Sequence, residues 1–172
     1  MSKCLNLTLA ASAACLIVGC ATQSRTDLTS AQRSQRVRTT AYTHTEKGGP
    51  RNALGDRLSG HHVMSAASDW SRFPLGTHFR IADTNEEYII DDYGTALIGT
   101  DTIDLYKTNR LAMKKWGVRH VDIAILKWGS EEESLKVLKP RCKHRCVRQM
   151  VVSLEKKRGK TVAQASSART SL

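Results

Sequence analysis

The stretch Asp92-Tyr93-Gly94-Thr95-Ala96-Leu97-Ile98-Gly99, followed by Ile103-Asp104-Leu105-Tyr106, decides how this chain is interpreted. It sets two carboxylates, Asp92 and Asp104, among glycines and apolar residues. The pKa of an aspartate is ordinarily about 3.9, and burial or a nearby like charge raises it. Asp104, between two apolar neighbours in a predicted strand, is where we expect acid–base chemistry.

Two further motifs lie upstream in a fixed order. Asp69 stands five residues before Pro74-Leu75-Gly76-Thr77, and Thr40-Ala41-Tyr42-Thr43 comes earlier. The ordered set resembles the 3D (three-aspartate) domain, the module shared by membrane-bound lytic transglycosylase A and short bacterial muralytic proteins. The resemblance covers roughly residues 37–126. It implies a mainly β fold, a six-stranded double-psi β-barrel of the rare-lipoprotein-A-like superfamily, and cleavage of peptidoglycan.

The resemblance also implies a role for each aspartate. Asp104 matches the catalytic acid, which later acts as a base toward the C6 hydroxyl of the sugar and leaves a 1,6-anhydro-N-acetylmuramyl end. Asp92 would tune that acid and stabilise charge, and Asp69 would orient the network. The residues alone also allow a turn at Asp92, a cap at Asp69 and a carboxylate satisfied by backbone donors at Asp104.

Substrate-binding residues are expected near the aspartates. Thr40 and Tyr42 belong to the opening strand, which lines the groove in relatives, and Lys107 follows the Asp104 strand. No cofactor and no metal site are expected.

Two residues depart from the family pattern. Tyr93 and Thr95 stand where members usually carry Thr and Gly. The main prediction is therefore a lytic transglycosylase that cuts between MurNAc and GlcNAc in cell-wall turnover. The alternative is a non-catalytic peptidoglycan-binding envelope lipoprotein, and a third hypothesis is an envelope scaffold that docks partners through its basic tail.

Hydrophobic periodicity predicts short strands and few helices, which by itself indicates only a small β-barrel or sandwich. A helix is expected over 109–116, ended by Gly117. Two more helices, over 131–139 and 145–157, would extend beyond the barrel, the second with an apolar stripe that could dock on it. The predicted strands cover residues 37–43, 62–66, 77–82, 87–92, 102–106 and 120–127.

The N-terminus is typical of an exported lipoprotein. Lys3 precedes an apolar run over 5–18 that is shorter than the roughly 20 residues of a membrane span, and Ile17-Val18-Gly19-Cys20 forms a lipobox. Residues 1–19 are therefore predicted to be a signal peptide, and Cys20 is predicted to be lipidated. Ordinary signal cleavage, which would leave a soluble periplasmic protein, is the alternative. Ala21 after the cysteine favours an outer-membrane lipoprotein facing the periplasm, with residues 20–36 as a polar tether.

Of the net charge of +11, one segment carries +10 and Lys3 carries the rest. Residues 136–172 hold eleven Lys or Arg against one Glu, whereas residues 20–135 hold fifteen basic and fifteen acidic side chains. The predicted domain, 37–129, therefore lies in a stretch with no net charge, and the basic extension, 130–172, is expected to be partly helical or disordered. For an exported protein, peptidoglycan carboxylates or anionic lipid are more natural partners for this extension than nucleic acid. Cys142 and Cys146 favour a disulfide or free thiols over a zinc site with His144.

Overall fold

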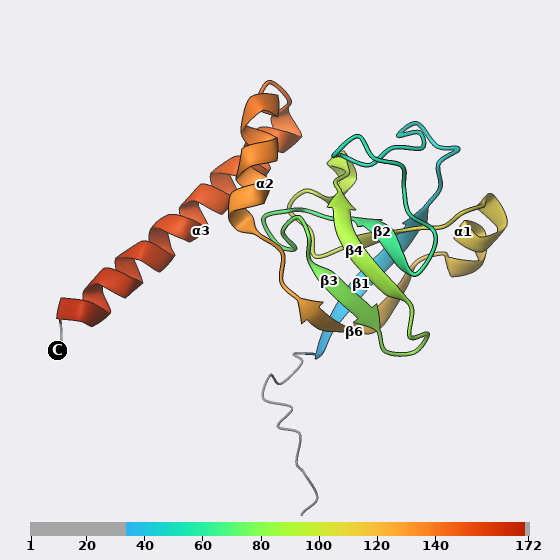
Figure 1. Ribbon diagram of the computed structural model, residues 1–172, viewed down its shortest axis with the longest axis horizontal. Coiled ribbons are helices and arrows are strands. Elements are labelled where there is room, and N and C mark those ends of the chain that lie inside the picture. Colours follow the sequence, from blue (N-terminus) through green and yellow to red (C-terminus); the bar gives the residue numbers. More distant parts are fainter. Residues whose placement is uncertain (1–33, 171–172) are drawn as a thin grey trace, which may run out of the picture. The chain divides into compact units, whose positions relative to one another are not determined.

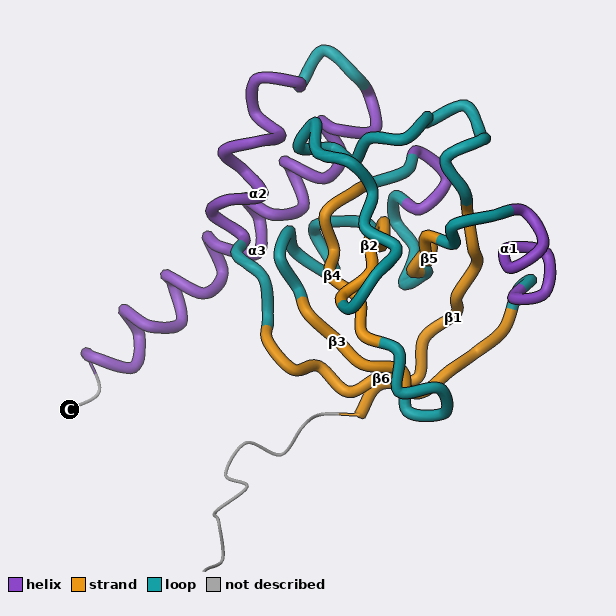
Figure 2. The backbone as a smooth tube through the Cα atoms, turned by 45° about the vertical axis from the view of Figure 1, so that its right-hand side comes forward, coloured by secondary structure: helices purple, strands orange, loops and turns teal. Residues whose placement is uncertain are grey.

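Six strands form a closed β-barrel in the computed structural model, which describes residues 34–170 (Figure 1). Their order around the barrel is β1-β5-β2-β4-β3-β6. The pairs β1–β5 and β2–β4 are parallel, and the other neighbours are antiparallel. Figure 2 labels all six strands. The strands are β1 (Ser34–Tyr42), β2 (Val63–Ala67), β3 (His78–Ile81), β4 (Glu87–Asp92), β5 (Ile103–Tyr106) and β6 (Arg119–Lys127). The mainly β class and the barrel are therefore confirmed.

The barrel core follows the two-residue period of its strands. Along β6, Val121, Ile123 and Ile125 are buried, while the residues between them are partly exposed. Phe79 and Tyr88 are register partners on β3 and β4, and their rings stack at 5.6 Å. The alternation that predicted the strands is thus the pattern that fills the barrel.

The first strand starts earlier than expected. Ser34, Gln35 and Arg36 were expected to belong to the tether, but they pair with residues 122–124 of β6 and open β1. No pattern of side chains predicts this extension, because main-chain pairing, and not an apolar side chain, extends the strand. Residues 1–33, which include the expected signal peptide and Cys20, lie outside the described residues.

Helix α1 (Arg110–Trp116) has the predicted end signals. Asn109 caps it by accepting a hydrogen bond from the Ala112 backbone N–H at 2.8 Å, and Gly117 ends it with φ +63°. The indole N–H of Trp116 donates to Thr39 on β1, so the end of this helix is tied to the barrel.

The basic extension folds into two helices, α2 (Glu131–Leu138) and α3 (Arg145–Thr170), joined through a short 3-10 turn, η2 (Lys139–Arg141). The predicted apolar stripe of α3 is buried, and α3 packs against α2. Helix α3 runs past the expected end at residue 157. In residues 34–170, none of the helices combines the length and apolar character that crossing a membrane requires.

A tight approach joins α2 to the barrel. The Ser134 hydroxyl accepts a hydrogen bond from the Leu75 N–H at 2.9 Å, and Ser130 N–H donates to the Leu75 carbonyl. A Cβ at Gly129 would collide with the carbonyl oxygens of Pro74 and Leu75. Only glycine therefore fits where the chain leaves the barrel for α2.

Candidate functional site

A groove of about 740 Å³ opens along one side of the barrel. Four residues expected at the active site line it: Thr40, Tyr42, Asp92 and Asp104. Its other walls come from the loop after β1 and from the segment around the 3-10 turn η1 (Thr95–Leu97). These further lining residues are Arg38, Thr43, Glu46, Lys47, Gly48, Ala67, Tyr93, Gly94, Thr95, Ala96, Leu97, Thr100 and Thr102.

Strand pairing sets the positions of the two aspartates in the groove. Strand β2 lies between β4 and β5, and Ala67 of β2 is the register partner of both Asp92 and Asp104. Two strand spacings separate the aspartate backbones by about 10 Å. Because Ala67 carries only a methyl group, the space between the two carboxylates stays open.

Asp104 is held at one oxygen. Thr40, its register partner on β1, donates a hydrogen bond from Oγ1 to Asp104 Oδ1 at 2.6 Å. Within residues 34–170, no hydrogen-bond donor reaches the second oxygen, Oδ2. Burial raises the pKa of Asp104, and the charge of Glu46 raises it further, although Thr40 and Arg38 act in the opposite direction. The arrangement gives an oriented carboxyl group with one oxygen available to a ligand.

Asp92 has both oxygens engaged. Its Oδ1 accepts from the Tyr93 N–H at 2.9 Å, and its Oδ2 lies 3.5 Å from the Tyr42 hydroxyl, which donates to it. Burial, together with the neighbouring charge of Asp91, raises the pKa of Asp92 to about 6. Burial and the nearby aspartates also raise the pKa of Tyr42, so its phenol stays protonated and remains a donor.

Asp91 is a buried carboxylate that the sequence analysis missed. Its Oδ2 accepts from Ser65 Oγ at 2.7 Å and from Asn52 Nδ2 at 2.9 Å. Its Oδ1 is buried without a partner in the described part of the chain, and burial raises the pKa of the group. A β-bulge causes this placement, because the register passes from Ala66–Ile90 to Ala67–Asp92 and leaves Asp91 as the extra residue. The doubled Asp91-Asp92 was the available signal.

Asp69 does not line the groove. Its Oδ1 accepts from the N–H and hydroxyl of Ser71 at 2.9 and 2.7 Å, and its Oδ2 accepts from the Gly99 N–H at 2.7 Å. Gly99 has φ +81°, a conformation that favours glycine. Asp69 therefore anchors the end of the loop whose earlier residues form the groove wall, and it acts on the site indirectly.

Lys107 does not reach the groove either. Its ammonium donates to both carboxylate oxygens of Glu86, at 3.0 and 3.2 Å, and to the Tyr88 hydroxyl at 2.6 Å. It also lies 4.6 Å from the centre of the Trp116 ring. Lys107 comes directly after the end of β5 at Tyr106, and its side chain is directed to Glu86 and Tyr88 and not to the groove. The prediction that Lys107 binds substrate with the aspartates is not supported by its position.

The two departures from the family pattern both lie on the groove wall. Tyr93 packs edge to face on buried Trp70, with ring centres 5.1 Å apart. Thr95 is exposed and begins the turn η1 without a positive φ. Neither residue strains the loop, and the Tyr93 ring is supported by the barrel core.

The described residues contain no group of three or more His, Cys, Asp or Glu placed to hold a metal ion. Cys142 and Cys146 are free thiols in this structure.

A closed barrel of six short strands with acidic residues in a side groove defines a carboxylate-bearing barrel of the double-psi type. Residues 64–127 match the family model of the 3D domain, and this chain carries a 3D domain. The family is associated with muralytic domains that act on peptidoglycan. The match begins in β2, so the opening strand with Thr40 and Tyr42 lies outside it. No curated protein matches the chain.

Proposed function

We propose that this protein is a peptidoglycan lytic transglycosylase that cleaves glycan strands between MurNAc and GlcNAc during cell-wall turnover. The observation that supports the proposal most is the position, orientation and raised pKa of the Asp104 carboxyl group. Its carboxyl group is half-buried in the groove, is oriented by Thr40 at 2.6 Å, and has a pKa that burial raises. Such a group can hold the proton that a glycosidic oxygen needs when it leaves.

In this mechanism one carboxyl group serves both halves of the reaction. Asp104 donates its proton to the glycosidic oxygen as the bond from that oxygen to C1 of MurNAc breaks. The resulting Asp104 carboxylate then accepts the proton of the C6 hydroxyl, whose oxygen bonds to C1. The product is a 1,6-anhydroMurNAc end, and no water enters. One carboxyl group with a free oxygen is sufficient for this sequence, unlike the paired carboxylates of most hydrolases.

Asp92 assists from the other side of Ala67, and Tyr42 of β1 reaches across to it. With a pKa of about 6, Asp92 is largely ionised at neutral pH, and its charge favours the positive charge that develops on the sugar ring. The Tyr42 hydroxyl donates to Asp92 and keeps that carboxylate in place. Thr40 and Tyr42 also present their hydroxyl groups along the groove, where they can bind the glycan.

The proposal places the enzyme in the envelope. A lipid anchor on Cys20 and a polar tether would hold the barrel at the periplasmic face of the outer membrane, within reach of the glycan. The sequence motif at residues 17–21 supports this localisation.

The test is mass analysis of the products released from purified sacculi. We expect the wild-type protein to release 1,6-anhydro muropeptides and Asp104→Asn to lose about 10²- to 10⁴-fold in rate. Asp83→Asn, which removes an exposed carboxylate in the turn between β3 and β4, is the matched control and should retain activity. Products with reducing ends would mean hydrolysis instead.

A second function has one observation in its favour. The groove carries the bulky Tyr93 where the family usually has Thr, so a barrel that binds glycan without cutting it is the alternative. Binding of sacculi by both wild type and Asp104→Asn, with no product from either, would establish that function.

A further inference from the structure

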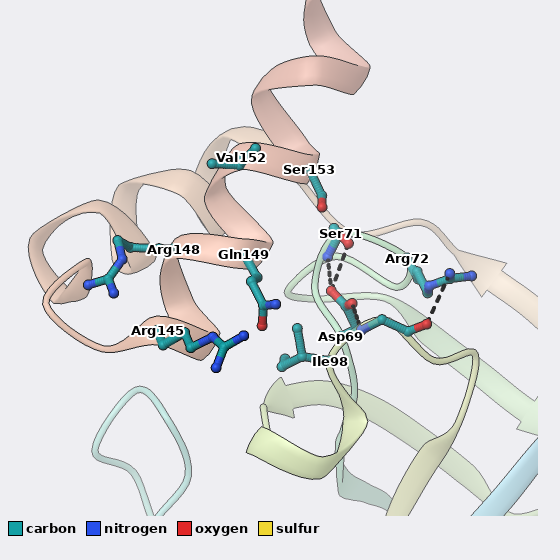
Figure 3. Close-up of a pocket in the computed structure, with 10 residues that line it drawn as sticks. Asp69, Ser71, Arg72, Ile98, Arg145, Arg148, Gln149, Val152 and Ser153 are labelled. Carbon is teal, nitrogen blue, oxygen red and sulfur yellow. Dashed lines mark hydrogen bonds between the residues drawn. The ribbon is translucent and has the colours of Figure 1, made fainter.

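A second pocket, of about 660 Å³, lies between α3 and the barrel (Figure 3). The barrel supplies residues that surround Asp69 and the end of the 94–99 loop. Helix α3 supplies the opposite wall. The lining residues are Asp69, Ser71, Arg72, Ile98 and Gly99 from the barrel, and Arg145, Arg148, Gln149, Val152 and Ser153 from α3.

Helix α3 has two faces in this region. Residues 147, 150, 151 and 154 form the buried stripe on the α2 side. The pocket-lining residues 145, 148, 149, 152 and 153 follow helical spacing on another face, and Val152 is 63% exposed. This second face therefore has no packing role that would account for its residues.

The polar groups in the pocket leave one cation without a partner. Asp69 has three donors of its own, and Arg72 pairs with Asp101. The Arg145 side chain makes no hydrogen bond or ion pair in the part of the chain that the structure describes. Figure 3 shows Arg145 and Gln149 directed toward Ile98 and Asp69, whereas Arg148 lies at the outer rim. Arg145 opens α3, where a positive charge does not stabilise the helix.

This pocket and the aspartate groove share one loop. Ile98 and Gly99 line the pocket, whereas Gly94, Thr95, Ala96, Leu97 and Thr100 line the groove. The Asp69–Gly99 hydrogen bond fixes the point where the loop passes from one to the other. A branched ligand could thus occupy both sides of the loop at once.

We propose that the pocket between α3 and the barrel binds the stem peptide of the same peptidoglycan strand whose glycan lies in the groove. This inference rests on the proposed function for the identity of the polymer. Each stem peptide branches from a MurNAc residue and carries free carboxylates, which match the unpaired Arg145 guanidinium. Gln149 and Ser153 can bond its peptide groups, and Ile98 with Val152 provides an apolar surface for its alkyl side chains.

The test compares two polymers in a pull-down binding assay with the full chain. Intact sacculi carry stem peptides, whereas amidase-treated glycan strands lack them. We expect Arg145→Gln to weaken binding to intact sacculi about three- to tenfold and to leave binding to bare glycan unchanged. Arg158→Gln, which removes the same charge from an exposed position on α3 outside the pocket, should change neither.

A second pair of variants tests the pocket by repulsion. Val152→Glu places a carboxylate in the pocket and should weaken binding to intact sacculi at least as much as Arg145→Gln does. Val118→Glu alters an equally exposed valine, 62% against 63%, outside the pocket and is its control. Free stem tetrapeptide should compete with intact sacculi for the wild type.

The outcomes separate this inference from the proposed function. Equal losses on both polymers, or no loss with either pocket variant, would overturn the stem-peptide site. Because the readout is binding, loss of the peptide preference in Arg145→Gln would support the site even if Asp104→Asn showed the protein not to cleave. Anhydro products from a wild type that binds bare glycan as well as intact sacculi would support the enzyme and reject the site.

Discussion

The groove and the turn around Asp69 carry aspartates from the same family motif, and the structure uses them differently. In the groove, Asp92 and Asp104 are half-buried, have raised pKa values, and lie on either side of Ala67. Asp69 is only 3% exposed, and three donors bind its two oxygens. A position in the motif therefore does not assign a role, whereas a place in the groove lining separates Asp92 and Asp104 from Asp69.

An Asp→Asn substitution should therefore raise the free energy of unfolding at Asp92 and lower it at Asp69. Replacing a groove aspartate with Asn removes a carboxylate whose ionisation is disfavoured in the folded state. Replacing Asp69 with Asn removes an acceptor of a short hydrogen bond from the fold, whereas the acceptor lost in Asp92→Asn is only the 3.5 Å partner of the Tyr42 hydroxyl.

Asp92→Asn should make the protein more stable at neutral pH. The folded-state pKa of about 6 lies above the ordinary value of 3.8, so the unfolded chain releases this proton first as the pH rises. The contribution of Asp92 to the free energy of unfolding therefore falls between about pH 4 and pH 6. At pH 7 the penalty is about 3 kcal/mol, since one pKa unit is about 1.36 kcal/mol.

Urea denaturation of wild type and Asp92→Asn at pH 4 and pH 7 measures this effect. The stability difference should be near zero at pH 4 and should favour the variant at pH 7. An equal difference at both pH values would contradict the raised pKa. Asp83→Asn, at an exposed position, controls for the general effect of removing a negative charge.

Asp69→Asn should destabilise the protein by about 2 kcal/mol at pH 7, because an amide cannot accept from both Ser71 and Gly99. Asp69→Asn should lower the rate of sacculus cleavage only indirectly, because Asp69 holds the end of the loop that forms the groove wall. Asp104→Asn, the matched change in the groove, should lose cleavage without losing stability. Denaturation and product release should be measured on both variants. Loss of cleavage by Asp69→Asn in a fully stable protein would mean that Asp69 acts in catalysis and not in the fold.

Much of the fold could be predicted because local signals specify it. Strand β4 has the predicted bounds, 87–92, and helix α1 is marked by Asn109 at its start and Gly117 at its end. The apolar stripe of α3 was visible in the spacing of Val147, Met150, Val151 and Leu154. Each of these features depends on residues that are close together in the chain.

The parts that escaped prediction depend on distant pairing. The burial of Asp91 follows from a bulge between β2 and β4, and the position of Lys107 follows from partners about twenty residues away. Ser34–Arg36 join β1 because β6 offers backbone partners. The pocket beside α3 forms only when α2 and α3 have folded onto the barrel. Its lining residues come from distant segments and therefore share no signal in the sequence.

Thr40→Val tests how the groove orients Asp104, because it removes the hydrogen bond from Thr40 to that carboxylate. The Thr40 hydroxyl stabilises the ionised form of Asp104, so its loss should raise the pKa of Asp104 further. We expect the rate of product release to fall about fivefold and the alkaline limb of its pH profile to move upward. Thr40→Ser, which keeps the hydroxyl, should restore both. An unchanged profile in Thr40→Val would mean that Thr40 does not position Asp104.

Tyr93→Thr returns the groove to the usual family residue and should have the smallest effect on activity. The Tyr93 ring rests edge to face on Trp70 at 5.1 Å, and losing such a pair costs about 0.5–1.5 kcal/mol of stability. Because the ring is supported by the core, we expect the rate of cleavage to change by no more than about threefold. A rise of tenfold or more in product release would mean instead that Tyr93 restricts the groove, and that binding of glycan is the main activity of the natural sequence. Thr95→Gly, on the exposed side of the same loop, is the matched control, since Thr95 has an ordinary backbone conformation and gains nothing from glycine.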